Sequence, residues 1–132
     1  MKYCKSDGLV LTNLTGKAGR QELYTKIRAM SWGGNTNTGD GFLKADQMLT
    51  GQSIAGRQQL VLMLTDGLAN EGVGDPIQYA VDRGTALAQH SLVYTVGMLG
   101  STAESYLPSV RQTLNAGYES RYFEVTFQDL AE

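Results

Sequence analysis

The chain has 132 residues, enough for one domain with a single hydrophobic core. It carries 11 Lys and Arg against 13 Asp and Glu, a formal net charge of −2, and the charges do not cluster by sign, so a nucleic-acid partner is not supported. Its apolar stretches fall far short of the roughly 20 residues that cross a bilayer, and we expect no membrane span.

The first half of the chain predicts a hairpin followed by two helices. Residues 3–14 surround Asp7-Gly8, a pair typical of hairpin turns. Apolar residues at helical spacing then predict helices over 19–30 and about 40–49. The segment 31–39 between them is predicted to be a loop rich in Gly, Asn and Thr.

The second half alternates strands with helices. Five apolar residues within 60–65 predict a strand that is buried on both faces. Asp75 is placed to cap the next helix, and Pro76 suits its first position. The later predicted elements are a helix to about residue 89, a strand over 92–97, a helix over 102–115, a strand over 122–127 and a helix opening at 129. This order predicts a Rossmann-like, doubly wound α/β fold, with a mostly parallel sheet and an antiparallel edge hairpin.

Polar residues are predicted to gather at one edge of this sheet. Asp66 follows the strand 60–65, and ligands of open α/β sheets bind at the carboxyl ends of strands. By itself, Asp66 is equally well explained as the start of an Asp-Gly turn. The loop 33–39 adds the hydroxyls of Thr36 and Thr38. A carboxylate with hydroxyls suits Mg²⁺, Mn²⁺ or Ca²⁺ rather than zinc.

The chain has one cysteine and one histidine, which limits the catalytic and metal sites that these residues could form. Cys4 is the only cysteine, which excludes an internal disulfide and a cysteine-based zinc site. Any histidine-dependent triad would need His90, the only histidine, which we interpret as a helix-end residue. A phosphate loop needs a lysine where Asp40 stands, after Gly39. We therefore expect no enzymatic activity.

Several motifs, taken together and in order, resemble a von Willebrand factor type A (VWA) domain, the module of integrin inserted domains and matrilins. They are Gly-Gly-Asn-Thr-Asn-Thr-Gly at 33–39, Leu-Met-Leu-Thr-Asp-Gly at 62–67, Gly-Asp-Pro at 74–76, Val-Tyr-Thr-Val-Gly at 93–97 and Tyr-Phe-Glu-Val-Thr-Phe-Gln-Asp-Leu at 122–130. The resemblance covers nearly the whole chain.

The resemblance implies a metal-ion-dependent adhesion site. In that site an Asp-x-Ser-x-Ser motif acts with a threonine and an aspartate, which Thr36 and Asp66 match, while Thr38 is expected to support the loop. Asp66 is also expected to act through a water molecule. The chain contains no Asp-x-Ser-x-Ser, so we expect Mg²⁺, or Mn²⁺ or Ca²⁺, to bind weakly or not at all.

Compared with the family, the chain is expected to be one truncated domain over 1–132. The first strand and first helix would be missing, and the final helix would be clipped. Alternatives are a degenerate domain or one completed by strand exchange with a partner. We expect such a chain to be unstable or oligomeric through its exposed sheet edge.

The predicted function is an adhesion-type, protein-binding module that recognises a protein ligand, plausibly through an acidic side chain. Its contact loops would be 31–39 and 67–75, presenting Asn35, Asn37, Asn70 and Glu71; from the residues alone, an ordinary solvated loop is the better explanation of the last two. The alternatives are a metal-independent matrix-assembly scaffold with a vestigial site and an intracellular chelatase-like or secretion-type module. The adhesion hypothesis would place the parent protein outside the cell or at its surface.

Overall fold

The computed structural model describes residues 16–29, 33–51, 55–101, 103–115 and 121–126. The chain divides into two compact units, residues 1–35 and residues 36–132, and each is described here by itself. The predicted hairpin at 3–14 and the predicted helix from residue 129 lie outside the described residues.

Helix α1 (Lys17–Arg28) is the regular element described in the first unit, and it begins two residues before its predicted start. None of its residues is buried, and Tyr24 and Ile27 are about half exposed. Lys26 pairs with Glu22 one turn away, and the Arg28 guanidinium lies 5.1 Å from the centre of the Tyr24 ring.

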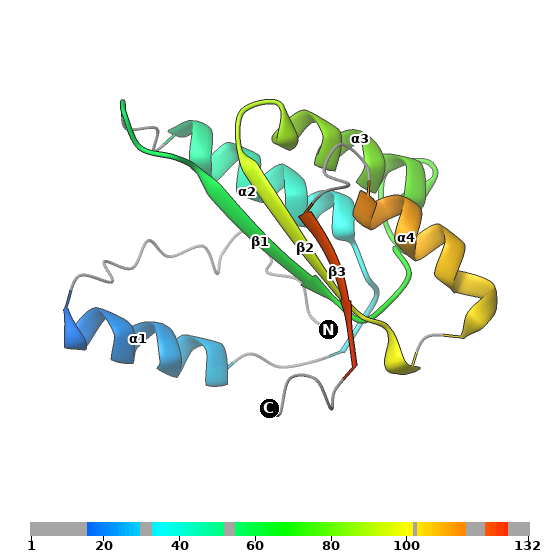
Figure 1. Cartoon of the computed structure of the whole chain (residues 1–132), viewed down its shortest axis with the longest axis horizontal. Helices are drawn as coiled ribbons and strands as arrows, with labels where there is room; N and C mark the ends of the chain where they lie inside the picture. The colour runs from blue at the N-terminus through cyan, green and yellow to red at the C-terminus, as the bar shows by residue number, and fades with distance from the viewer. Residues whose placement is uncertain (1–15, 30–32, 52–54, 102, 116–120, 127–132) are drawn as a thin grey trace. The chain divides into compact units, whose positions relative to one another are not determined.

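The second unit contains three strands and three α-helices in alternating order. They are α2 (Thr38–Gly51), β1 (Leu60–Thr65), α3 (Pro76–Ala88), β2 (Leu92–Met98), short 3₁₀ turns at Leu99–Ser101 and Glu104–Tyr106, α4 (Leu107–Asn115) and β3 (Tyr122–Val125). The strands form a parallel sheet in the order β1-β2-β3, and α2, α3 and α4 lie along one face of it (Figure 1). The predicted α/β fold with a parallel sheet is confirmed.

Local sequence signals set the ends of these helices. The Asp75 carboxylate accepts hydrogen bonds from the backbone N–H groups of Ile77 (2.9 Å) and Gln78 (2.8 Å), which confirms the predicted cap of α3. Helix α2 begins before the predicted residue 40, because the Asn37 side chain accepts a hydrogen bond of 3.0 Å from the backbone N–H of Asp40.

The hydrophobic core lies between the sheet and its helix layer. Its centre is formed by Phe42 of α2, Met63 of β1, Leu87 of α3 and Val93 of β2. Phe42, Leu87 and Val93 are at most 1% exposed, so the residues that the periodicity predicted as apolar stripes supply the packing on this side.

The prediction that β1 is buried on both faces is wrong. Met63 and Thr65 are buried, but Leu60 and Leu62 are each 57% exposed and Leu64 is 42% exposed. The cause is the topology: both crossovers step across the sheet in the same direction, and right-handed crossovers then place both connecting helices on the same face.

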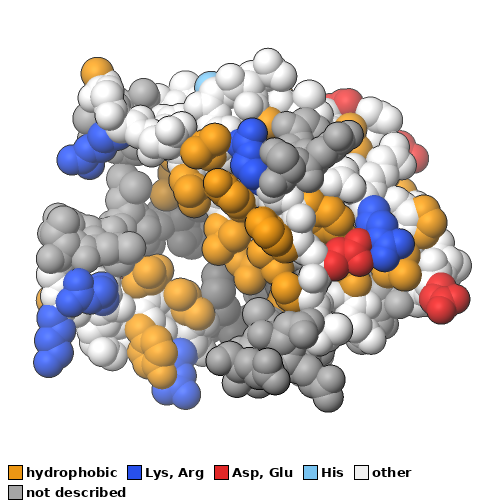
Figure 2. Space-filling model, viewed as in Figure 1, with side chains coloured by type: hydrophobic (Ala, Val, Ile, Leu, Met, Phe, Trp, Pro, Cys, Tyr) orange, Lys and Arg blue, Asp and Glu red, His pale blue; other side chains and the backbone are white. Residues whose placement is uncertain are grey.

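The other face of the sheet is lined by apolar side chains and is called the open face below. The strand registers place these residues on it: Leu60, Leu62 and Leu64 of β1; Leu92, Tyr94, Val96 and Met98 of β2; Phe123 and Val125 of β3. Figure 2 shows hydrophobic side chains gathered across the middle of this view. Separately, none of the described helices has the length and apolar character needed to cross a membrane.

Candidate functional site

The predicted site residues Thr36 and Asp66 occupy loops of the second unit. Thr36 lies two residues before α2, and Asp66 follows the last residue of β1. The turn at Asp66 is fastened by Thr65, whose hydroxyl lies 3.4 Å from both the backbone N–H and the carbonyl oxygen of Gly67. Asp66 is half-buried at the carboxyl end of β1, where the alternating pattern predicted it.

The loop that carries Thr36 is hydrogen-bonded to the loop that follows β1. The backbone N–H of Thr36 donates to Oδ1 of Asn70 at 2.7 Å. In return, the Thr36 carbonyl accepts from the backbone N–H groups of Asn70 (3.0 Å) and Glu71 (3.2 Å). Both backbone polar groups of Thr36 are therefore held by residues more than thirty positions away along the chain.

A second fastening lies one turn further along α2. The Tyr79 hydroxyl donates a hydrogen bond of 2.9 Å to Oδ1 of Asp40. Its ring fills the space beside two glycines: a Cβ added to Gly39 would lie 2.3 Å from Tyr79 Cδ1, and one added to Gly72 would lie 2.8 Å from the same atom. The ring therefore requires glycine, or a shift of the ring, at both positions.

The third predicted residue, Thr38, is buried at the start of α2. It is the first residue of α2 and only 1% exposed, and its Oγ1 has no hydrogen-bond partner within the described part of the chain. A buried hydroxyl without a partner carries a desolvation cost of about 1–3 kcal/mol. Such an orphaned oxygen beside Thr36 is a feature that an incoming donor or cation can satisfy.

Comparison with known proteins decides the family. A family model described as von Willebrand factor type A domain matches residues 5–131. The chain belongs to this family. Neither a curated protein nor a solved structure matches the chain significantly. VWA domains are protein-interaction modules of the adhesion type, and that general function applies to this chain.

The family implies a divalent metal ion at this edge, and oxygen donors are present there. The Asp66 carboxylate and the hydroxyls of Thr36 and Thr38 are hard oxygen donors, which fit Mg²⁺ or Mn²⁺. Among the described residues, no group of three or more His, Cys, Asp or Glu side chains is placed to hold a metal ion. The fit is therefore to a cation held by one carboxylate, with hydroxyls and waters completing its coordination.

The predicted contact residues have different environments. Asn70 and Glu71 are exposed and lie against Thr36 through the bonds given above. Asn37 is turned toward α2, where its side chain also donates to Oδ2 of Asp40 at 3.2 Å. Asn35 is exposed and belongs to the first unit.

A polar network that sequence reasoning missed lies at the opposite end of the sheet. His90 Nε2 is 2.8 Å from Oδ1 of Asp46, and its Nδ1 is 3.1 Å from the Ser91 hydroxyl. This order of groups resembles a hydrolytic triad, but Ser91 is only 5% exposed and its hydroxyl also donates to Oε1 of Gln59 at 3.3 Å. The Ser91 hydroxyl is thus buried and shared, and the network ties the turn after α3 to α2 and to Gln59, the residue before β1.

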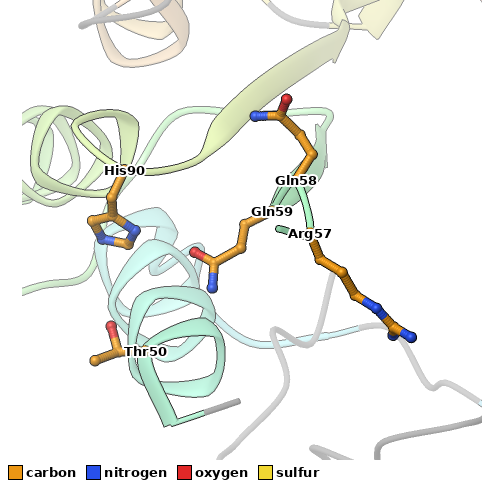
Figure 3. Close-up of a pocket in the computed structure, with 5 residues that line it drawn as sticks. All are labelled: Thr50, Arg57, Gln58, Gln59 and His90. Atoms are coloured by element: carbon orange, nitrogen blue, oxygen red, sulfur yellow. The ribbon is translucent and has the colours of Figure 1, made fainter. Parts of the chain in front are cut away.

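A cavity of about 460 Å³ opens beside this network and is lined by Thr50, Arg57, Gln58, Gln59 and His90. Figure 3 shows Gln59 directed toward the space between His90 and Thr50, whereas Arg57 extends away from them. Gln59 is already occupied, because its Nε2 donates to the Leu49 carbonyl at 2.9 Å. Thr50 and His90 are likewise bonded within the protein, both to Asp46.

The strongest electrostatic perturbation lies between α4 and β3. Arg111 donates from Nε and Nη2 to the two carboxylate oxygens of Glu124, at 2.5 and 2.9 Å, and Tyr122 donates from its hydroxyl at 2.6 Å. These bonds, that of Arg111 first, lower the pKa of Glu124 to about 2. Burial and the bond to Glu124 raise the pKa of Tyr122. Arg111 and Tyr122 both donate their hydrogen bonds to Glu124, so we interpret the cluster as a structural link between α4 and β3.

Proposed function

We propose that this VWA domain binds a protein ligand at the edge formed by the Thr36 loop and the loop from Asp66 to Asp75. The observation that carries the proposal is the hydrogen bonding between Thr36 and Asn70, which joins two polar loops into one surface at the carboxyl ends of the strands. That edge is where open α/β sheets bind their ligands. Gly67, Gly72 and Gly74 leave much of this surface to backbone groups.

Recognition would involve a divalent cation, held by Asp66 and Thr36. When bound, such an ion supplies positive charge that a carboxylate of the partner can neutralise. The chain's own part is to hold the Thr36 hydroxyl and the Asp66 carboxylate at the same edge and to present Asn70 and Glu71 beside them. Thr38 lies in the first turn of α2, two residues after Thr36, and its buried hydroxyl has no partner within the described part of the chain.

The proposal concerns binding rather than catalysis. The residues at this edge offer oxygen ligands and hydrogen-bonding groups but no activated nucleophile. For the parent protein, the proposal implies a place outside the cell or at its surface, where adhesion modules work. A metal-independent scaffold domain and an intracellular chelatase-like or secretion-type module are the alternatives that the experiment below and a search for the parent's targeting signals would separate.

Titration with Mn²⁺, followed by NMR, tests the metal part of the proposal. In the full chain we expect paramagnetic broadening of the backbone amides around Thr36 and Asp66 before those elsewhere, and recovery of the signals on adding excess Mg²⁺. Asp66→Asn should weaken this broadening by tenfold or more, about 1.4 kcal/mol or greater in binding free energy. Asp82→Asn is the matched control, because Asp82 is an exposed carboxylate within α3.

The outcome separates the two modes of binding. Broadening that is equal in wild type and in Asp66→Asn would overturn the metal site. In that case, the metal-independent scaffold becomes the better account of this VWA domain. Selective broadening lost only in Asp66→Asn supports the metal-bridged mode.

A further inference from the structure

Asn70 is exposed, yet its side chain makes the shortest of the hydrogen bonds that join the two loops. Its Oδ1 accepts from the Thr36 N–H at 2.7 Å, while the two bonds to the Thr36 carbonyl come from backbone N–H groups. Only the first of these bonds depends on the identity of a side chain. Replacing Asn70 therefore removes one defined bond and leaves the other two donors in place.

The position of Asn70 gives that bond its effect. Asn70 stands four residues after Asp66 in the same loop, and Thr36 stands two residues before the start of α2. The bond thus connects the loop that carries the carboxylate to the loop that carries the hydroxyl. The Thr36 hydroxyl oxygen is bonded to Cβ, so only the χ1 angle separates it from the backbone. Holding the Thr36 backbone therefore restricts where that hydroxyl can lie. Ligand groups need placement within about 0.5 Å to act together.

The residues on either side of this contact are held by other bonds. Asn37, the next residue after Thr36, is bonded through its side chain to Asp40, and Asp40 also accepts from Tyr79. The Thr65 and Gly67 contacts hold the turn at Asp66. Thr36 itself lies in the coil before α2, and its own backbone N–H and carbonyl bond to Asn70 and Glu71. These bonds are the direct link between the Thr36 backbone and the loop that carries Asp66.

We infer that Asn70 is a positioning residue, which couples the loop after β1 to the Thr36 loop and so restricts where the Thr36 hydroxyl lies relative to the loop that carries Asp66. The inference rests on the proposed function for its consequence in metal binding, but the coupling itself is a property of the free chain. A ligand that moves the loop carrying Asn70 will also move Thr36, and cation binding at Thr36 will in turn bias that loop.

The first test measures amide hydrogen exchange in the full chain without metal. Asn70→Ala should speed exchange of the Thr36 amide by roughly 5–10-fold, because the side-chain acceptor is gone. Asn70→Asp should restore slow exchange, since a carboxylate oxygen accepts the same bond. Asn115→Ala, at the end of α4, is the matched control and should leave Thr36 unchanged. Unchanged exchange in Asn70→Ala, or failure of Asn70→Asp to restore it, would overturn the coupling.

The second test measures Mn²⁺ affinity in the same variants, with thermal melts to confirm folding. Asn70→Ala should weaken Mn²⁺ by about 10–100-fold, the range typical of groups that orient metal ligands. Asn70→Asp should retain affinity, which a merely structural loss would not. If wild type shows no selective Mn²⁺ binding, the proposed metal site fails while the exchange result still decides the coupling. Fast Thr36 exchange with unchanged Mn²⁺ affinity would overturn the positioning role.

Discussion

The hydroxyl of Tyr79 donates a 2.9 Å hydrogen bond to Oδ1 of Asp40, although the two residues are 39 positions apart in the chain. Asn37 donates to Oδ2 of the same carboxylate at 3.2 Å. Both carboxylate oxygens are therefore occupied, one from α3 and one from the loop before α2. The carboxylate also lies in the first turn of α2, where the helix dipole favours negative charge.

Replacing Tyr79 by phenylalanine tests the worth of this bond. We expect Tyr79→Phe to lower the free energy of unfolding by about 1–2 kcal/mol, because the lost bond has a charged acceptor that is partly buried. Urea denaturation measures the change. Tyr106→Phe is the control: Tyr106 is 52% exposed, and its loss should cost less than about 0.5 kcal/mol. Equal costs for both variants would contradict the assignment.

At Gly39, beside the Tyr79 ring, we expect alanine to lower the stability of the protein, which is the opposite of its usual effect in a helix. Alanine normally stabilises a helix by up to about 1 kcal/mol relative to glycine. At Gly39, however, a Cβ would meet the Tyr79 ring at 2.3 Å, and we expect Gly39→Ala to destabilise by about 1–3 kcal/mol. Gly51→Ala, with nothing within 4 Å of its Cβ, should be neutral or stabilising.

A double variant isolates the ring as the cause. In a Tyr79→Ala background the obstacle is absent, so adding Gly39→Ala should then be neutral or stabilising in thermal melts. A cost that persists without the ring would show that another contact opposes the Cβ.

The Glu124 cluster predicts a pH dependence of stability. Arg111 and then Tyr122 hold the pKa of Glu124 near 2, against an ordinary value of 4.5. The native state keeps this carboxylate ionised where the unfolded chain protonates it. The contribution of Glu124 is therefore complete above pH 4.5 and is lost as the pH falls toward 2.

NMR titration of the Glu124 carboxyl checks that prediction. Arg111→Gln should raise the pKa of Glu124 toward its ordinary value and flatten the pH dependence of unfolding in this window. Arg20→Gln, on exposed α1, should change neither quantity. A Glu124 midpoint that stays low in Arg111→Gln would assign the effect to Tyr122 instead.

Neighbouring residues of β1 give a paired test of the open face. Leu62→Gln should change the free energy of unfolding by less than about 1 kcal/mol, because Leu62 is 57% exposed. Met63→Gln should cost about 2–5 kcal/mol, since Met63 lies in the core and would leave its amide buried. Similar costs for the two variants would mean that the open face is covered in solution.

Local signals in the sequence predicted the elements well. The strand at 60–65 and the start of α3 agree with the structure because an apolar run, Asp75 and Pro76 act over a few residues. The start of α2 was placed too late because the apolar spacing begins only at Phe42, whereas the Asn37 side chain caps the helix earlier. The same reasoning placed Asp66 directly after the strand β1 and Thr36 in the loop before α2, as the structure has them.

The contacts between elements were beyond this kind of reasoning. Tyr79 was not predicted to touch Asp40, because residues on separate helices meet only once the crossover geometry is known. The only advance signal was the pair of glycines, Gly39 and Gly72, which leave space for a ring. The exposure of Leu62 also follows from topology, since a continuous apolar run does not reveal which faces are covered.

Hydrogen bonds connect α2 to α3, or to the turn after it, at two points along α2. Tyr79 holds Asp40 near their beginnings, and His90, after the end of α3, holds Asp46 further along α2. Two such connections resist sliding of one helix along the other, the shear motion by which packed helices commonly adjust. If the Asn70 loop is displaced, we therefore expect the coil before α2 to change its conformation. Helices α2 and α3 should keep their position relative to each other and move as one rigid body.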